Sequence, residues 1–248
     1  MRHPLRAAVF AAGALAGCAP AARVPAPQPP IGHEFVADYN RIGSVVLVEL
    51  GDRSEIVKEW IVLPRSVVIS HGGDVIARIL DARSGLLGPI VAVDADSRRI
   101  WLGTAQGVFT LDKSNDDLAR FQAGSPMEDH VVAVGIDPSH PDTGWAVTRA
   151  GVMKIEHRFG RTESFVFEEP ILPRAELVAM DRDFVWVGGN DGLLRFSKQW
   201  GRWDRFAYPG GSTRPLRLTV DAEARALAIT ENALYRYDSA FERWLRVD

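Results

Sequence analysis

The sequence predicts an all-β protein built from repeated sheets of four antiparallel strands. Three observations lead to this prediction. A segment of about 13 residues occurs four times and aligns without a gap. Each copy alternates apolar and polar residues, as half-buried strands do. Each copy also carries a turn signal at its centre, so it indicates a β-hairpin.

The four repeated segments share two apolar columns. They are IWLGTAQGVFTLD from Ile100, GWAVTRAGVMKIE from Gly144, VWVGGNDGLLRFS from Val185 and ALAITENALYRYD from Ala226. The first column holds Trp101, Trp145, Trp186 and Leu227, spaced by 44, 41 and 41 residues, and the second, twenty residues later, holds Phe121, Phe165, Phe206 and Val247. Agreement in two distant columns indicates a repeated structural unit.

Turn residues and flanking strands complete each unit. The turns are expected at Gly107, Gly151, Gly192 and Ala233, and Asn190-Asp191-Gly192 is the strongest signal because these residues tolerate positive φ. A short apolar run ending in aspartate precedes each hairpin, at Asp94, Asp137, Asp181 and Asp221. We expect these carboxylates to accept hydrogen bonds from turn amides. With a fourth strand near the second column, each unit matches a β-propeller blade.

The region before Pro89 indicates one further blade, although we find no tryptophan or glycine column there. Its strands are predicted in SVVLVEL, EIVKEWIVL, SVVIS and VIARIL, with the last turn at 71–74. First strands then begin near residues 44, 89, 131, 176 and 216, so 44–248 is predicted to form five blades of four antiparallel strands. Six blades are the alternative, followed by a β-sandwich. Residues 31–43 form an N-terminal edge segment that would cover a blade edge or close the ring.

At these residues the chain resembles the two-component regulator propeller repeat, whose pattern is V-x-A-I-x-x-D followed by W-I-G-T-x-x-G-L-x-R-Y. VWVGGNDGLLRFS and IWLGTAQGVFTLD carry the resemblance, whereas IDPSHPDTGWAVT is more similar to photosystem-assembly and sialidase-type repeats. The resemblance implies a propeller and no particular activity, because these families share a fold and not a chemistry.

Residues 1–17 have the features of an export signal. Arg2, His3 and Arg6 form a basic head, and the apolar run from Ala7 to Ala16 is too short to span a bilayer as a helix. The following LAGC resembles the lipobox of bacterial lipoproteins. The resemblance implies cleavage before Cys18, the only cysteine, and its acylation with fatty acids such as palmitate. This covalent lipid is the only non-protein group that we expect; no other cofactor is predicted.

Residues 18–30 join the lipidated cysteine to the domain. Ala19 to Pro30 contains five prolines in twelve residues, which predicts a semi-rigid polyproline II linker of about 40 Å. Two or three acyl chains give a durable membrane anchor. Enteric lipoproteins with aspartate after the cysteine stay at the inner membrane, so Ala19 favours the outer one. We therefore expect a membrane-anchored protein facing the periplasm or the cell surface.

Composition and motifs argue against several classes of function. The chain carries 29 basic and 32 acidic residues, and 27 and 32 remain, a net charge of −5, once Arg2 and Arg6 leave with the signal. This balance predicts no nucleic-acid partner. The six histidines have no metal-ligand spacing, and no H-E-x-x-H, C-x-x-C or G-x-S-x-G motif occurs. We predict neither a metal site nor a catalytic residue.

The loops that join strands two and three, and those that join consecutive blades, should share one face. This candidate binding face would collect Arg83, Glu128, Asp129, His130, Arg149, Glu168, Glu169, Arg174, Asn190, Tyr208 and Arg214. We expect a non-enzymatic scaffold, or an accessory subunit, that binds another envelope protein. The alternatives are a carbohydrate-binding or glycoside-hydrolysing propeller, with its carboxylates from Glu128, Asp129, Glu168 and Glu169, and a small-ligand sensor. The tryptophan column should pack blade against blade.

Overall fold

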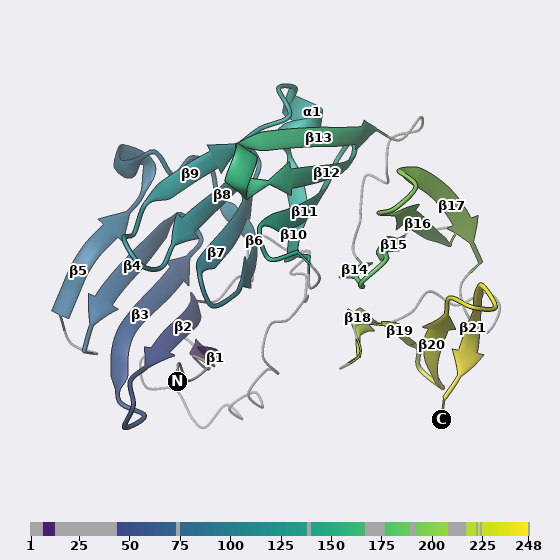
Figure 1. Ribbon diagram of the computed structural model, residues 1–248, viewed down its shortest axis with the longest axis horizontal. Coiled ribbons are helices and arrows are strands. Elements are labelled where there is room, and N and C mark those ends of the chain that lie inside the picture. The colour runs from purple at the N-terminus through teal and green to yellow at the C-terminus, as the bar shows by residue number, and fades with distance from the viewer. Residues whose placement is uncertain are drawn as a thin grey trace, which may run out of the picture.

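The computed structural model describes residues 7–12, 44–72, 75–137, 140–166, 177–188, 192–207, 217–221, 223 and 225–247. These residues form five antiparallel sheets that follow one another in chain order around the molecule (Figure 1). Four sheets have four strands, and the first has five. The predicted all-β propeller of five four-stranded blades is confirmed, with β1 added as a fifth strand beside the first blade, β2 to β5.

Every sheet has consecutive strands as neighbours, so each is a simple meander. The first sheet contains β1 (Ala7–Ala12), β2 (Ser44–Leu50), β3 (Ile56–Leu63), β4 (Ser66–His71) and β5 (Val75–Leu80). The second contains β6 (Ile90–Ala95), β7 (Arg99–Thr104), β8 (Gly107–Asp112) and β9 (Leu118–Phe121), and the third β10 (Val131–Ile136), β11 (Thr143–Thr148), β12 (Gly151–Glu156) and β13 (Arg161–Val166). The fourth contains β14 (Leu177–Met180), β15 (Phe184–Gly188), β16 (Leu193–Ser197) and β17 (Arg202–Phe206), and the fifth β18 (Arg217–Val220), β19 (Ala226–Ile229), β20 (Leu234–Asp238) and β21 (Arg243–Arg246).

The observed blade boundaries agree with the predicted ones to within one residue. First strands begin at Ser44, Ile90, Val131, Leu177 and Arg217. The predicted turn at Gly107 is a left-handed glycine with φ of 110°, which a larger residue would adopt only under strain. Part of the predicted signal peptide forms β1, which pairs antiparallel with β2. The predicted linker 18–30 and edge segment 31–43 lie outside the described residues.

A ladder of tryptophans forms the centre of the core. Each lies on the second strand of one blade, counted from β2 in the first, and packs among buried residues of the next: Trp60 with the second sheet, Trp101 with the third, Trp145 with the fourth and Trp186 with the fifth. The predicted blade-to-blade packing of the column is therefore confirmed. Trp60 extends the ladder into the first sheet, where no tryptophan column was predicted. It stands 41 residues before Trp101, at the same period.

The turns divide between two opposite faces of the ring. Strands one and three of a blade run in the same direction, so the turns that follow them emerge together on what we call the lower face. The turns between strands two and three, and the links between blades, form the upper face. These links include the 3-10 helix η1 (Ala82–Ser84) and the short helix α1 (Pro126–Asp129), whereas the 3-10 helix η2 (His157–Phe159) follows the third strand of its blade. None of the helices in the described ranges is long and apolar enough to cross a membrane.

Candidate functional site

The structure describes five of the eleven residues predicted for the upper binding face. They are Arg83, Glu128, Asp129, His130 and Arg149. The other six, Glu168, Glu169, Arg174, Asn190, Tyr208 and Arg214, lie outside the described residues. Among those described, the link that contains α1 brings Glu128, Asp129 and His130 together, and Arg149 joins them from the β11–β12 turn.

Both acids of this link are engaged in local hydrogen bonds. Ser125 Oγ donates to Glu128 Oε1 at 2.8 Å and accepts from Glu128 N at 3.3 Å, so the pair caps helix α1. Buried Asp129 accepts from Ala123 N at 2.6 Å and more weakly from Gly124 N and Gln122 Nε2. These contacts hold the link in shape.

His130 and Arg149 are neighbours through the backbone as well as through charge. Arg149 N donates to His130 O at 3.1 Å. Burial, and then the charge of Arg149, lower the pKa of His130, so the imidazole is neutral at pH 7. Arg83 stands on η1, where its backbone N–H donates to Asp81 Oδ1 at 2.8 Å. Only Arg149 and Arg83 present exposed charge among the described residues predicted for this face.

A second polar group is buried between the third and fourth sheets. Lys198 Nζ donates to the carbonyl of Asp181 at 2.8 Å, lies 3.5 Å from Asp137 Oδ2 and sits 5.6 Å from the Trp145 ring centre. Burial lowers the pKa of Lys198. Trp145 Nε1 donates to Asp137 Oδ2 at 3.1 Å. The group fastens one blade to the next, and the same arrangement recurs where Lys113 lies over Trp60 and donates to Asp96 O.

Arg195 forms the matching fastening between the fourth and fifth sheets. Its guanidinium lies 4.5 Å from the ring centre of Phe184 and 4.6 Å from that of Phe206. It donates to the hydroxyl of Tyr237 and, at 2.7 Å, to Asp204 Oδ2. A buried cation enclosed by aromatic faces and paired with carboxylate is held strongly. The cage is filled by the protein's own side chain, so it is part of the scaffold.

Strand β5, at one edge of the first sheet, and the start of β3, in its middle, expose a group of apolar side chains, which we call the apolar edge. It consists of Ile56, Val57, Val75, Ile76 and Ile79, which are 41% to 65% exposed. These are five of the eleven large hydrophobic side chains exposed in the described ranges, so exposure is concentrated in one sheet. Three of them belong to β5, the outermost strand of that sheet (Figure 1). Such concentrations mark interaction sites.

The lower face carries a second unusual feature, which we call the aromatic–arginine turns. The turns after the third strands of the third, fourth and fifth sheets present Phe159, Trp200 and Phe241, which are 64%, 69% and 68% exposed. In each turn the next residue is left-handed, namely Gly160, Gly201 and Glu242, and the one after that is an exposed arginine, Arg161, Arg202 and Arg243. The equivalent turn of the second sheet has Asn115, left-handed Asp116 and Asp117 instead.

These turns have a signature in the sequence. F-G-R, W-G-R and F-E-R begin at 159, 200 and 241, at the 41-residue period of the repeat. Trp203 and Trp244 are half-buried against core clusters, whereas Trp200 is exposed. Within the described part of the chain, no group of His, Cys, Asp and Glu is arranged to hold a metal ion.

Neither a scan against protein families nor a search of curated proteins found a match. Solved structures do resemble the chain. Virginiamycin B lyase from Staphylococcus aureus superposes with a TM-score of 0.56 at 12% identity, over 81% of this chain and 68% of that one. The extracellular domain of a putative hybrid two-component system from B. thetaiotaomicron gives 0.53 at 13% identity, over 87% of this chain and 32% of that one. The WD40 domain of Neurospora crassa Pan2 gives 0.53 at 10% identity, over 78% and 65%. At these identities the likeness shows the β-propeller fold and leaves the activity to the site.

Proposed function

We propose that the protein is a lipid-anchored, non-enzymatic propeller of the bacterial cell envelope that binds another envelope protein through its apolar edge. Cys18 would carry the acyl chains, and residues 18–30 would hold the propeller away from the headgroups. Residue Ala19 favours the outer membrane. The extracellular domain among the similar structures is compatible with this location.

The apolar edge is the observation that carries the proposal. Edge strands of monomeric proteins are usually protected by charged residues, proline or a covering segment, because their free backbone groups can pair with another chain. Strand β5 instead exposes Val75, Ile76 and Ile79 and has one charged residue, Arg78. The Arg78 guanidinium is turned to the carbonyl of Asp116 in the second sheet, at 2.9 Å. A partner that adds a strand to β5 would pair with its free backbone groups, and one that packs an apolar surface on it would bury its exposed side chains.

The glycosidase alternative is less well supported by the described acids. A glycosidase needs two carboxylates free to exchange protons and attack across one bond. Glu128 serves as part of a helix cap and Asp129 as a loop clamp. These roles support binding rather than hydrolysis as the function of the propeller.

The experiment compares capture of envelope proteins by full-length, anchored variants. The test variant is Val75→Ser with Ile76→Ser and Ile79→Ser, and the control is Met127→Ser, which removes an exposed apolar side chain from the upper face. We expect the wild type and the control to recover the same partner from solubilised membranes, and the triple variant to lose it while remaining folded. Equal recovery by all three, or hydrolysis of a glycan panel that Glu128→Gln abolishes, would contradict the proposal.

A further inference from the structure

We propose that the aromatic–arginine turns form a docking surface for an anionic phospholipid membrane. This inference rests on the proposed function in one respect, because the lipid anchor would bring the lower face to a bilayer. The surface consists of Phe159 and Arg161, Trp200 and Arg202, and Phe241 and Arg243. It lies on the face opposite the predicted binding loops.

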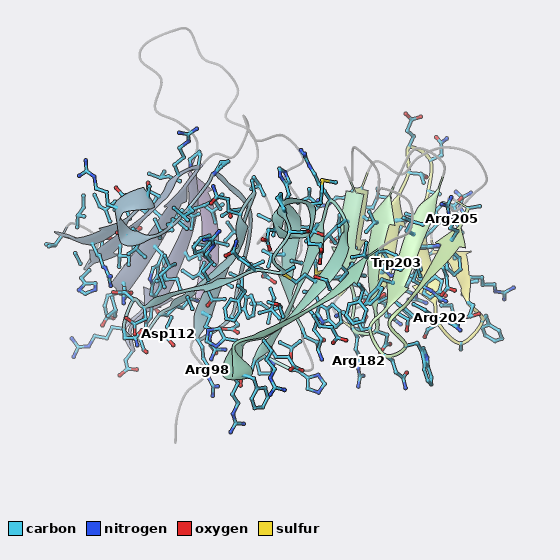
Figure 2. The ribbon with its side chains drawn as sticks, turned by 90° about the horizontal axis from the view of Figure 1, so that it is seen from above. Arg98, Asp112, Arg182, Arg202, Trp203 and Arg205 are labelled. Carbon is cyan, nitrogen blue, oxygen red and sulfur yellow. The ribbon has the colours of Figure 1, made fainter. Side chains whose placement is uncertain are left out.

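The three turns lie on the same face of the propeller, so their exposed side chains can contact one flat surface. They occupy equivalent positions in three consecutive blades, each with an aromatic residue, a left-handed residue and an arginine. Equivalent turns of a ring emerge on the same side. Figure 2 shows Arg202 along one edge of the molecule together with Arg98 and Arg182, which belong to other turns of the lower face. Three separate projecting turns on one face fit a flat partner better than a concave or narrow one.

The residue types match the boundary between headgroups and acyl chains. Tryptophan and other aromatic rings favour this boundary, where the ring is partly desolvated. Arginine next to each ring can bind lipid phosphate bidentately. Arg158 and Arg161 each lie 5.8 Å from the Phe159 ring centre, and Arg243 lies 5.2 Å from that of Phe241. The arginines therefore stand beside the rings that would enter the membrane.

Charge on the lower face supports an anionic surface. Four acids near these turns are paired: Asp116 with Lys58, Glu156 with Lys154, and Asp204 and Glu242 with Arg195, while Asp204 also lies 4.0 Å from Arg202 Nε. Asp117 and Asp183 are exposed on the same face. Arg161 and Arg243 form no ion pair with another residue of the described ranges. The whole chain carries a net charge of −3, which repels it from anionic lipid. Binding to such lipid would therefore depend on a local cluster of this kind.

The test measures binding of the full chain to lipid vesicles in the Cys18→Ser background, so that no acyl chain contributes. Vesicles of phosphatidylethanolamine with phosphatidylglycerol are compared with vesicles of phosphatidylcholine. We expect a preference for the anionic vesicles. Arg161→Gln with Arg202→Gln and Arg243→Gln should weaken partitioning about a hundredfold, since each surface arginine contributes roughly fivefold. Phe159→Ser with Trp200→Ser and Phe241→Ser should weaken binding to both kinds of vesicle.

Matched controls lie on the upper face. Arg83→Gln with Arg149→Gln, and separately Met127→Ser, should leave partitioning unchanged. Trp200→Phe should keep vesicle binding but lose most quenching by brominated lipid, because Trp60, Trp101, Trp145 and Trp186 are buried and Trp203 and Trp244 are half-buried against the core. The inference is overturned if the turn variants and the upper-face variants behave alike. It is also overturned if the turns bind only an acidic envelope protein and no vesicle.

The outcome separates this inference from the proposed function. Loss of vesicle binding, with capture through the apolar edge intact, would overturn the lipid assignment alone. A wild-type chain that is neither lipidated nor found in the envelope would overturn the proposed function, whatever the vesicles show.

Discussion

Trp186 Nε1 donates a hydrogen bond of 2.8 Å to Oδ2 of Asp181, and both side chains are buried in the fourth sheet. Asp181 Oδ1 also accepts from Asp183 N and Phe184 N, at 2.8 and 2.6 Å. One carboxylate thus closes the β14–β15 turn, as expected of a strand-end aspartate, and orients a ring of the tryptophan ladder. The fold therefore depends on a buried acid whose ionisation can be measured.

Stability should change with pH through Asp181. Burial raises its pKa from 3.8 to about 6. As the pH rises, the unfolded chain releases this proton at a lower pH than the folded chain does. The contribution of the protonated Asp181 carboxyl to the free energy of unfolding is therefore fully present below pH 3.8 and is lost as the pH rises through 6. Asp181→Asn removes the ionisation and keeps an acceptor. We expect the wild type to lose about 3 kcal/mol of unfolding free energy relative to the variant between pH 4 and 7.

Asp142 serves as a control, because its effect on stability should change with pH in the opposite direction to that of Asp181. The hydrogen bond from Arg99, at 2.6 Å, lowers the pKa of Asp142, so its contribution is present above pH 3.8 and is lost on acidification. Asp142→Asn should therefore cost stability at neutral pH and none in acid. Denaturant titrations across the pH range measure both variants. A pH-independent difference for Asp181→Asn would show that the carboxyl is not titrating as described.

Trp60 should matter as much as the tryptophans found in the repeats. Its side chain is fully buried between the first and second sheets, so Trp60→Ala leaves a cavity and should cost about 3–5 kcal/mol. Trp200→Ala, at an exposed turn, should change stability by less than about 0.5 kcal/mol. Thermal and denaturant unfolding measure both. Equal effects would contradict the assignment of Trp60 to the ladder.

Gly144 permits the close approach of Trp101. A Cβ atom at Gly144 would lie 2.3 Å from Trp101 Cζ3, in the preceding sheet. Gly144→Ala should therefore destabilise the protein by about 1–3 kcal/mol through overpacking. In the Trp101→Leu background the same change should cost much less. A double-mutant cycle measures this coupling. Strictly additive changes in unfolding free energy would show that the two residues are not in steric contact.

Arg195 should contribute more to stability than any exposed ion pair. Arg195→Met removes a buried cation that is held by two aromatic faces and the carboxylate of Asp204, and should cost about 3 kcal/mol. Arg195→Lys should recover only part of this, because an ammonium cannot stack or bind as a fork. Arg225→Met, at an exposed pair with Asp221, should have no measurable effect. Similar losses of stability for Arg195→Met and Arg225→Met would contradict the stabilising role given to the aromatic and carboxylate contacts of Arg195.

The sequence predicted the fold well because a repeat states the same structural requirement several times. Trp101, Trp145 and Trp186 recur with turn glycines at a fixed distance, so chance alternation is excluded. Trp60 was missed because Ser66 stands in its sheet where the other hairpins have the turn glycine six residues after the tryptophan, although the 41-residue period reached it. Packing between blades, which requires Gly144 and Trp101 to meet, depends on three-dimensional distances that no local pattern contains.

The candidate sites were harder to predict than the fold. Whether the predicted loop residues form one binding face stays a prediction, and sequence position alone could not tell that the Glu128 and Asp129 carboxylates accept hydrogen bonds from neighbouring amides and a hydroxyl. The apolar edge was equally hidden, because Val75, Ile76 and Ile79 have the composition of a buried strand. Only the order of strands shows that β5 is outermost.

Photo-crosslinking in intact cells tests the central claim most directly. A photoreactive residue at Ile79, on the apolar edge, is compared with one at Met127 on the upper face. We predict that Ile79 gives one adduct with a single envelope protein, that Met127 does not, and that Cys18→Ser abolishes the adduct by releasing the propeller from the membrane. The account would be contradicted by no adduct at Ile79, or by the same adduct from both positions or without the anchor.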